Sequence, residues 1–168
     1  MIRFGWVFVL TVMLTACSPD YNWRQMQVGD GTVTAFFPDR PRTERRSLEF
    51  EGHQLDFSLT SASVGNALFT VGHAGLGSRL GQDEEARGQL YAATLNSLYR
   101  NLGAQPPKVL PPAGQPFVMQ GQGAAQHIRL KAIVWIGTSA LVEGLVTAPA
   151  DSFPEDQADE FLRGIQIP

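Results

Sequence analysis

The alternation of apolar and polar positions divides the chain into a short leader and one larger domain. After an early charge at Arg3, residues 4–14 are almost all apolar. This run is shorter than the roughly 20 residues that a helix needs to cross the hydrocarbon core of a bilayer. A charge, a short apolar run and then small residues are the order of a secretory signal peptide. We therefore expect a cleaved leader over residues 1–16.

Beyond the leader, alternating and β-branched runs predict antiparallel strands within one domain, residues 23–168. Alternation is clearest in residues 53–60, as in a half-buried strand. Residues 140–147 are apolar on both faces apart from Glu143 and Thr147, which predicts a central strand. The predicted strands and hairpin arms span residues 23–28, 32–37, 47–63 with a turn near 51–52, 67–73, 117–120 at an edge, 124–136, 140–147 and 165–167.

A change of period predicts one long helix over residues 83–102. Apolar residues recur there at spacings of three and four, with Asp83 placed to cap the start and Gly103 to end the helix. A short helix ending at Arg163 follows Ser152-Phe153-Pro154-Glu155, which has the spacing of a capping box. The expected fold class is therefore α+β, an antiparallel sheet with one long and one short helix packed on it.

The end of the leader, Leu14-Thr15-Ala16-Cys17, resembles the lipobox of bacterial lipoproteins: a branched apolar residue, two small residues and then cysteine. The resemblance implies that the Cys17 thiol takes a diacylglycerol, that the leader is cut before Cys17, and that the new amino group is acylated, for example with palmitate. Each buried methylene contributes about 0.8 kcal/mol to membrane binding, so several acyl chains form a firm anchor.

Ser18, the residue after the cysteine, resembles lipoproteins that are sorted to the outer membrane of a cell with two membranes. We therefore expect lipid on Cys17, a tether over residues 17–22, and a domain that faces the periplasm. Cys17 is the one cysteine of the sequence, so thiolate metal sites and thiol nucleophiles in the domain are excluded.

The balance of charge argues against a nucleic-acid partner. The chain has 13 Lys and Arg against 16 Asp and Glu, a net charge of -3, whereas nucleic-acid binding needs a concentrated basic face. The densest basic run is interleaved with acids, so residues 39–51 sum to zero. Binding of anionic lipid head groups or an envelope polymer is one interpretation, but a solvated hairpin edge guarded by charges is favoured. The basic residues are Arg40, Arg42, Arg45 and Arg46.

Two stretches give the domain a family resemblance: Phe36-Phe37-Pro38-Asp39-Arg40-Pro41 and Phe161-Leu162-Arg163-Gly164-Ile165-Gln166-Ile167. With the order of elements, they resemble the PsbP-like α/β/α sandwiches, which include the extrinsic subunits of photosystem II and many bacterial lipoproteins of unassigned role. The resemblance covers most of residues 23–168 through degenerate motifs. It implies an antiparallel sheet with helices packed on it, and an accessory or binding role more than catalysis. No metal or partner contact of the photosystem members matches a position here.

The glycines between residues 72 and 81 lie between a strand and the long helix, where a phosphate-binding loop is found in other folds. No Gly-Lys-Ser/Thr follows them, and Asp83, Glu84 and Glu85 place negative charge where phosphate would bind. We interpret this segment as a flexible connector.

Four residues are candidates for site chemistry: His53, His73, His127 and Glu143. The histidines lack ligand spacing on one element, which favours core or edge positions over metal ligands or general bases. Glu143 lies in an apolar strand, where an ionised carboxylate is costly unless it is paired. It is either a site acid with a raised pKa or a partner of Lys131 or Arg129 across the hairpin, and the pair is favoured.

The sequence therefore predicts a non-enzymatic accessory or binding lipoprotein that engages an envelope protein, a polymer or a small ligand through a sheet face or groove and needs no cofactor. Two alternatives stay open. One is an envelope hydrolase whose histidine and carboxylate come together in space, and the other is a structural role in envelope integrity.

Overall fold

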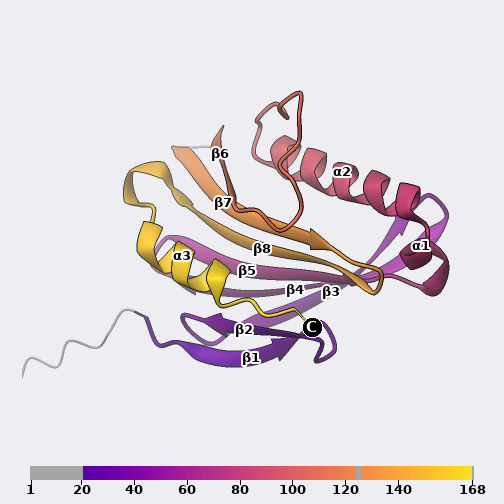
Figure 1. The fold of residues 1–168 in the computed structure, drawn as a ribbon. Helices are drawn as coiled ribbons and strands as arrows, with labels where there is room; N and C mark the ends of the chain where they lie inside the picture. The colour runs from indigo at the N-terminus through magenta and orange to yellow at the C-terminus, as the bar shows by residue number, and fades with distance from the viewer. Residues whose placement is uncertain (1–20, 124–125, 168) are drawn as a thin grey trace, which may run out of the picture.

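The computed structural model describes residues 21–123 and 126–167, in which eight strands form two antiparallel sheets accompanied by three α-helices (Figure 1). The larger sheet has the strand order β3-β4-β5-β8-β7-β6. Its strands are β3 (Arg42–Phe50), β4 (His53–Val64), β5 (Ala67–Gly75), β8 (Ala140–Pro149), β7 (His127–Ile136) and β6 (Phe117–Gln122). The smaller sheet is the hairpin of β1 (Arg24–Val28) and β2 (Val33–Phe37).

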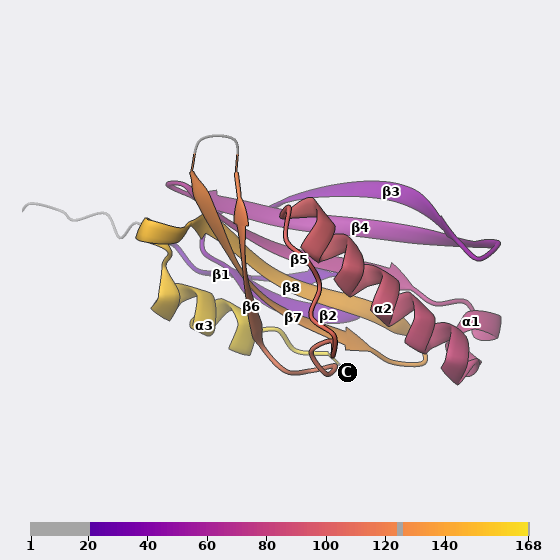
Figure 2. The same cartoon turned by 90° about the horizontal axis from the view of Figure 1, so that it is seen from above.

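The helices lie on both faces of the large sheet. They are α1 (Ser78–Gln82), α2 (Glu84–Asn101) and α3 (Glu155–Arg163), and a 3-10 turn, η1 (Ala150–Ser152), precedes the last. In Figure 1, α2 lies above the sheet, whereas β1, β2 and α3 lie below it. Figure 2 shows the same arrangement from above, with α2 lying over the large sheet.

The predicted fold class is wrong, because the strands form two sheets and a third helix is present in the described residues. The β1-β2 hairpin packs as a separate layer, since the inward residues Val33, Ala35 and Phe37 are buried in the core below the large sheet. The extra helix, α1, occupies the predicted flexible connector. Leu80 is buried there, so tertiary packing stabilises a helix that Gly81 disfavours.

Apolar cores lie on both faces of the large sheet, and β8 contributes residues to both faces. Leu141 packs with Leu90, Leu95 and Val134 on the α2 side, whereas Val142 and Val146 pack with Phe69 and Phe161 on the opposite side. β8 lies between β5 and β7 in the strand order. The prediction of a central strand at residues 140–147 is therefore confirmed.

Local signals also set the bounds of α2. Asp83 Oδ1 accepts a hydrogen bond from the Ala86 backbone N–H at 3.0 Å, and Gly103 adopts a φ of 68° just past the helix end. The predicted capping box before α3 is wrong: Pro154 is the N-cap and no side chain caps the helix. Ser152 belongs instead to η1, so it is not available to cap α3.

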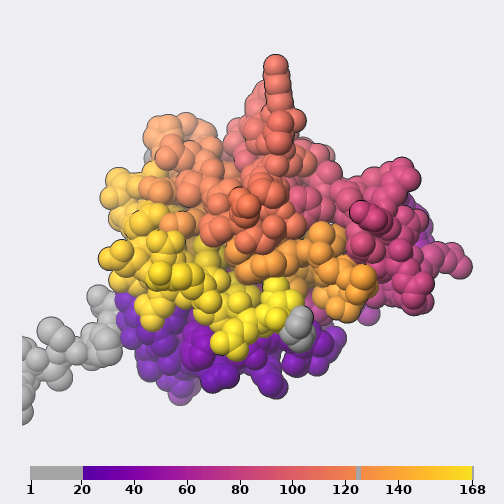
Figure 3. All heavy atoms as spheres, in the orientation of Figure 1, coloured from indigo at the N-terminus to yellow at the C-terminus, as the bar shows by residue number. Residues whose placement is uncertain are grey.

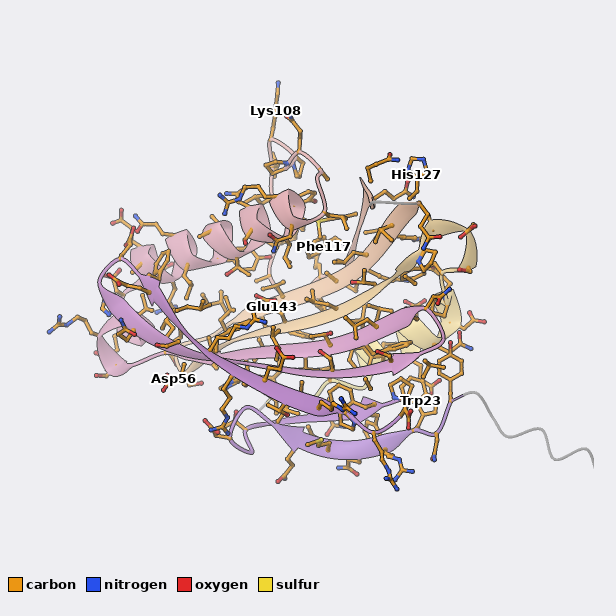
Figure 4. All side chains as sticks on the ribbon, turned by 180° about the vertical axis from the view of Figure 1, so that it is seen from behind. Trp23, Asp56, Lys108, Phe117, His127 and Glu143 are labelled. Atoms are coloured by element: carbon orange, nitrogen blue, oxygen red, sulfur yellow. The ribbon has the colours of Figure 1, made fainter. Side chains whose placement is uncertain are left out.

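The segment between α2 and β6 is rich in proline and stands out from the molecular surface (Figure 3). Lys108 lies at its tip, and the neighbouring Val109 is 84% exposed (Figure 4). No helix within residues 21–123 and 126–167 is both long and apolar enough to cross a membrane. The predicted leader and Cys17 lie outside the described residues.

Candidate functional site

A groove of about 440 Å³ runs between α2 and the strands β3, β4, β5 and β8. Volumes of roughly 300–1,000 Å³ are usual for small-molecule sites. The lining is mostly aliphatic and aromatic, and includes Leu48, Leu55, Phe57, Leu90, Leu98 and Leu141. This groove lies on the face of the large sheet opposite to the β1-β2 hairpin and α3.

The groove exists because α2 presents short side chains to part of the sheet. Ala93, Thr94 and Ser97 line the groove from the helix. Leu90 and Leu95 are buried beneath α2 and hold the helix on the sheet. Where the shorter side chains face the strands, space is left between the two layers.

Glu143 of β8 lines this groove and is only 7% exposed. It makes no hydrogen bond or ion pair with another residue of the described ranges, 21–123 and 126–167. In Figure 4 it lies between α2 and the strands. Burial raises the pKa of the Glu143 carboxyl to about 7, because removal from water disfavours the charged form.

The surroundings of the carboxylate are apolar. Gly72 of β5 is the cross-strand partner of Glu143. A β-carbon at Gly72 would lie 3.3 Å from Glu143 Oε2 and 3.0 Å from Phe57 Cζ, so the two side chains meet above the glycine. Neither Phe57 nor Gly72 offers a side-chain hydrogen-bond donor to the acid.

The predicted pairing of Glu143 with Lys131 or Arg129 is wrong. Both basic residues project from the opposite face of β7 and meet α3. Lys131 Nζ lies 2.6 Å from Glu155 Oε1 and 2.6 Å from Asp159 Oδ1, and an Arg129 nitrogen lies 2.9 Å from Glu155 Oε2. The register sets this outcome, because side chains alternate between the faces of a strand.

The structure does not bring the four sequence candidates together. His73 is paired with Val142 and Gly72 with Glu143, so His73 and Glu143 face opposite sides of the sheet. His53 lies at the start of β4 beside the β3-β4 turn, and His127 at the exposed start of β7. Within residues 21–123 and 126–167, no group of three or more His, Cys, Asp or Glu is placed to hold a metal ion.

His73 is held in a structural contact on the hairpin side. Its Nε2 lies 3.3 Å from Thr32 Oγ1, and that hydroxyl donates to the Gly29 carbonyl at 2.6 Å. The Thr32 hydroxyl can therefore only accept from the ring, which assigns the proton to Nε2. Burial lowers the pKa of His73, and the nearby charge of Asp30 opposes this shift. A β-carbon at Gly29 would lie 2.4 Å from the ring, so the turn packs directly on it.

A second hollow of about 300 Å³ adjoins His73, lined in part by Asp30, Arg45 and Ser58. Arg45 pairs there with Asp30 at 2.9 Å, and Arg46 pairs with Glu44 at 3.1 Å. β3 is exposed along nearly all its length. These features agree with a solvent-exposed edge strand that carries charged side chains. The groove beneath α2, which contains the buried Glu143, is therefore a stronger candidate site than this second hollow.

The chain matches no protein-family model, no curated protein and no solved structure. The resemblance to the PsbP-like family stays a prediction, and the functional argument depends on the groove.

Sequence reasoning singled out Glu143 but missed the residues that surround it. The alternation from residue 53 to 60 placed Phe57 on an apolar face, but it gave no sign that the ring meets Glu143. The run of small residues beside the apolar stripe of α2, including Ala93 and Ser97, was the available signal for a gap between helix and sheet.

Proposed function

We propose that this protein is an envelope lipoprotein, held on a membrane by lipid on Cys17, whose periplasmic domain binds a small apolar ligand in the groove beneath α2. The observation that carries the proposal is the buried Glu143 carboxyl, which has no partner among the described residues, in a mostly apolar groove. Acids are rarely left buried without a partner, because the charged form loses its hydration. A ligand that contacts the acid explains why it lies there.

Binding is favoured over catalysis because the part of the chain that the structure describes gives Glu143 no catalytic partner in the groove. The groove lining contains no histidine, cysteine or lysine among the described residues. Ser97 and Thr94 offer hydroxyl groups, but within residues 21–123 and 126–167 neither hydroxyl is hydrogen-bonded to Glu143 or to another base that could activate it as a nucleophile. A mostly apolar pocket with a single buried polar group suits the recognition and orientation of a ligand.

The anchor and the groove support each other in this proposal. A short tether would hold the domain near a lipid leaflet, where apolar molecules concentrate.

The anchor is tested with a full-length Cys17→Ser variant and radiolabelled fatty acid. The variant is expected to lose both the label and its retention in the membrane fraction. A variant that keeps both would remove the lipid anchor from the proposal.

The groove is tested by photolabelling of the full chain in phosphatidylcholine nanodiscs. The probe is an eight-carbon alcohol with a diazirine in its chain, and mass spectrometry identifies the labelled peptides. We expect label in peptides from α2, β4 and β8. Ser97→Trp fills the groove from the helix and is expected to reduce this label at least fivefold.

The matched control is Asn96→Trp, because Asn96 is the neighbour of Ser97 on α2 but does not line the groove. It is expected to keep the label of the parent chain. Label that is absent from the groove peptides, or that Ser97→Trp leaves unchanged, would contradict binding in the groove.

A further inference from the structure

We infer that the ligand of this groove is an apolar molecule that carries one protonated amine, and that its ammonium group pairs with the Glu143 carboxylate. This inference rests on the proposed function, because it names the chemistry of the occupant of that same groove. Its basis is the charge of the lining and the place of Glu143 within it.

Once Glu143 has lost its proton, the ionisable residues of the lining leave one uncompensated negative charge. They are Glu49 of β3, Arg100 of α2 and Glu143 of β8, whereas the lining residues from β4 and β5 are Leu55, Phe57, Leu59 and Ala74. Glu49 and Arg100 carry opposite charges, so their contributions offset each other. Arg100 is exposed and Glu143 is buried, which places the net negative charge inside the groove.

Head groups of different charge would meet this acid differently. A carboxylate would be repelled. An alcohol would donate one hydrogen bond and leave the negative charge uncompensated. An ammonium both donates and compensates the charge, and charge-assisted hydrogen bonds are about twice as strong as neutral ones. The low dielectric of a groove lined with leucine and phenylalanine strengthens this attraction.

Lys131 is a buried charge with a structural role, and its surroundings differ from those of Glu143. Lys131, with a side chain 12% exposed, is held by carboxylates of Glu155 and Asp159 at 2.6 Å each. Glu143 is similarly shielded from water but has no such partner in the described residues. A ligand ammonium would compensate the negative charge of Glu143, as these two acids compensate the positive charge of Lys131.

Amine binding is therefore expected to depend on pH. Glu143 must lose its proton before it can pair with an ammonium, and burial raises its pKa to about 7. Affinity for the amine should rise about tenfold per pH unit up to pH 7 and then level off. Glu49 and Arg100 are the other titratable groups that face the groove, from β3 and α2.

The test compares two photoprobes with the same eight-carbon, diazirine-bearing chain, one a primary amine and one an alcohol. The full chain is again held in phosphatidylcholine nanodiscs, so partition of each probe into lipid is the same for every variant. Glu143→Gln should reduce amine labelling of the groove peptides at least tenfold at pH 8 and change alcohol labelling less than twofold. Glu160→Gln, the same change on the exposed face of α3, should alter neither.

The outcomes separate this inference from the proposed function. Equal labelling by amine and alcohol, or amine labelling that Glu143→Gln leaves intact, would overturn the amine while the groove stays a binding site. Failure of both probes to label the groove peptides would overturn the proposed function itself. Amine labelling of the parent chain that does not rise between pH 5.5 and pH 7 would also count against the ammonium pair.

Discussion

The Glu143 carboxylate lies over the backbone of Gly72, with Oε2 3.3 Å from the place where a β-carbon at Gly72 would be. The two residues are cross-strand partners in β8 and β5. A side chain at position 72 would compete with the acid and with the ring of Phe57 for the same space. The glycine therefore leaves room for a buried acid on the floor of the groove.

Gly72→Ala is expected to reduce both stability and ligand access. The new methyl group would meet Phe57 Cζ at 3.0 Å and Glu143 Oε2 at 3.3 Å. Overpacking of this kind costs roughly 1–3 kcal/mol, offset in part by the smaller entropy of the unfolded alanine chain. We expect a net loss of about 1 kcal/mol in urea unfolding.

Gly75→Ala is the matched control in the same strand, because a β-carbon at Gly75 would meet nothing within 4 Å. Its free energy of unfolding should stay within about 0.5 kcal/mol of the parent, the usual range for surface substitutions. Equal losses in the two variants would show that crowding above Gly72 is not the cause.

Glu143 should make the protein less stable as the pH rises from about 4.5 to about 7. In that range the unfolded carboxyl has lost its proton, whereas the folded one, with its pKa raised by burial to about 7, still holds it. The stabilising contribution of the protonated form is complete below pH 4.5 and is lost through pH 7. At 1.36 kcal/mol per pKa unit, the loss is about 3 kcal/mol.

The measurement is urea unfolding of the parent and Glu143→Gln from pH 4 to pH 8. The neutral variant should gain on the parent as the pH rises and be the more stable protein at pH 8. A constant difference between the two curves would mean that the pKa of Glu143 is the same in the folded and unfolded chains, which would contradict the shift caused by burial.

His73 should act in the opposite direction on stability. Burial lowers its pKa below 6.5, so under mildly acidic conditions the unfolded histidine binds a proton that the folded one does not. The stability that His73 contributes is present above pH 6.5 and is lost as the pH falls through its folded pKa. Between pH 7.5 and pH 5 the free energy of unfolding of the parent should therefore fall, and that of His73→Gln should fall less. An identical loss of stability in the two proteins would mean that groups other than His73 cause the pH dependence.

Lys131 should anchor α3 to the sheet. Lys131→Met keeps the apolar stem but leaves Asp159 and Glu155 without the ammonium that lies 2.6 Å from each. Because these acids are partly exposed, we expect a loss of about 1–2 kcal/mol rather than the 3–5 kcal/mol of a fully buried pair. Arg46→Met, which breaks an exposed pair with Glu44, should cost less than about 0.5 kcal/mol. Similar costs in both variants would contradict a special role for Lys131.

Local signals in the sequence were sufficient for several elements. The helix α2 was predicted from its own periodicity, and its cap needs only Asp83 and the backbone of Ala86. The turn between β3 and β4 was predicted at residues 51–52, where Glu51 and Gly52 both have positive φ. The central place of β8 followed from apolar residues on both its faces. Each of these depends on residues that are close in sequence.

The partners of buried charges could not be predicted in the same way. Lys131 and Glu143 lie on the two arms of one hairpin, but Lys131 is paired with Val146 and Glu143 with Val134. The register therefore puts the two side chains on opposite faces of the sheet. The sequence pattern indicated both arms but did not define the register closely enough to exclude the pair.

The sequence by itself determined where most of the strands and the two longer helices lie, although the strand expected at residues 165–167 is only an isolated bridge between Gln166 and Thr34, and it singled out Glu143 as an acid in an apolar strand. Only the tertiary structure decided that β1 and β2 form a separate layer, that α1 is a helix, and that Glu143 faces a groove in which no described residue pairs with it. The physical reason is that periodicity records which side of an element is buried. What covers that side depends on packing between segments far apart in the chain.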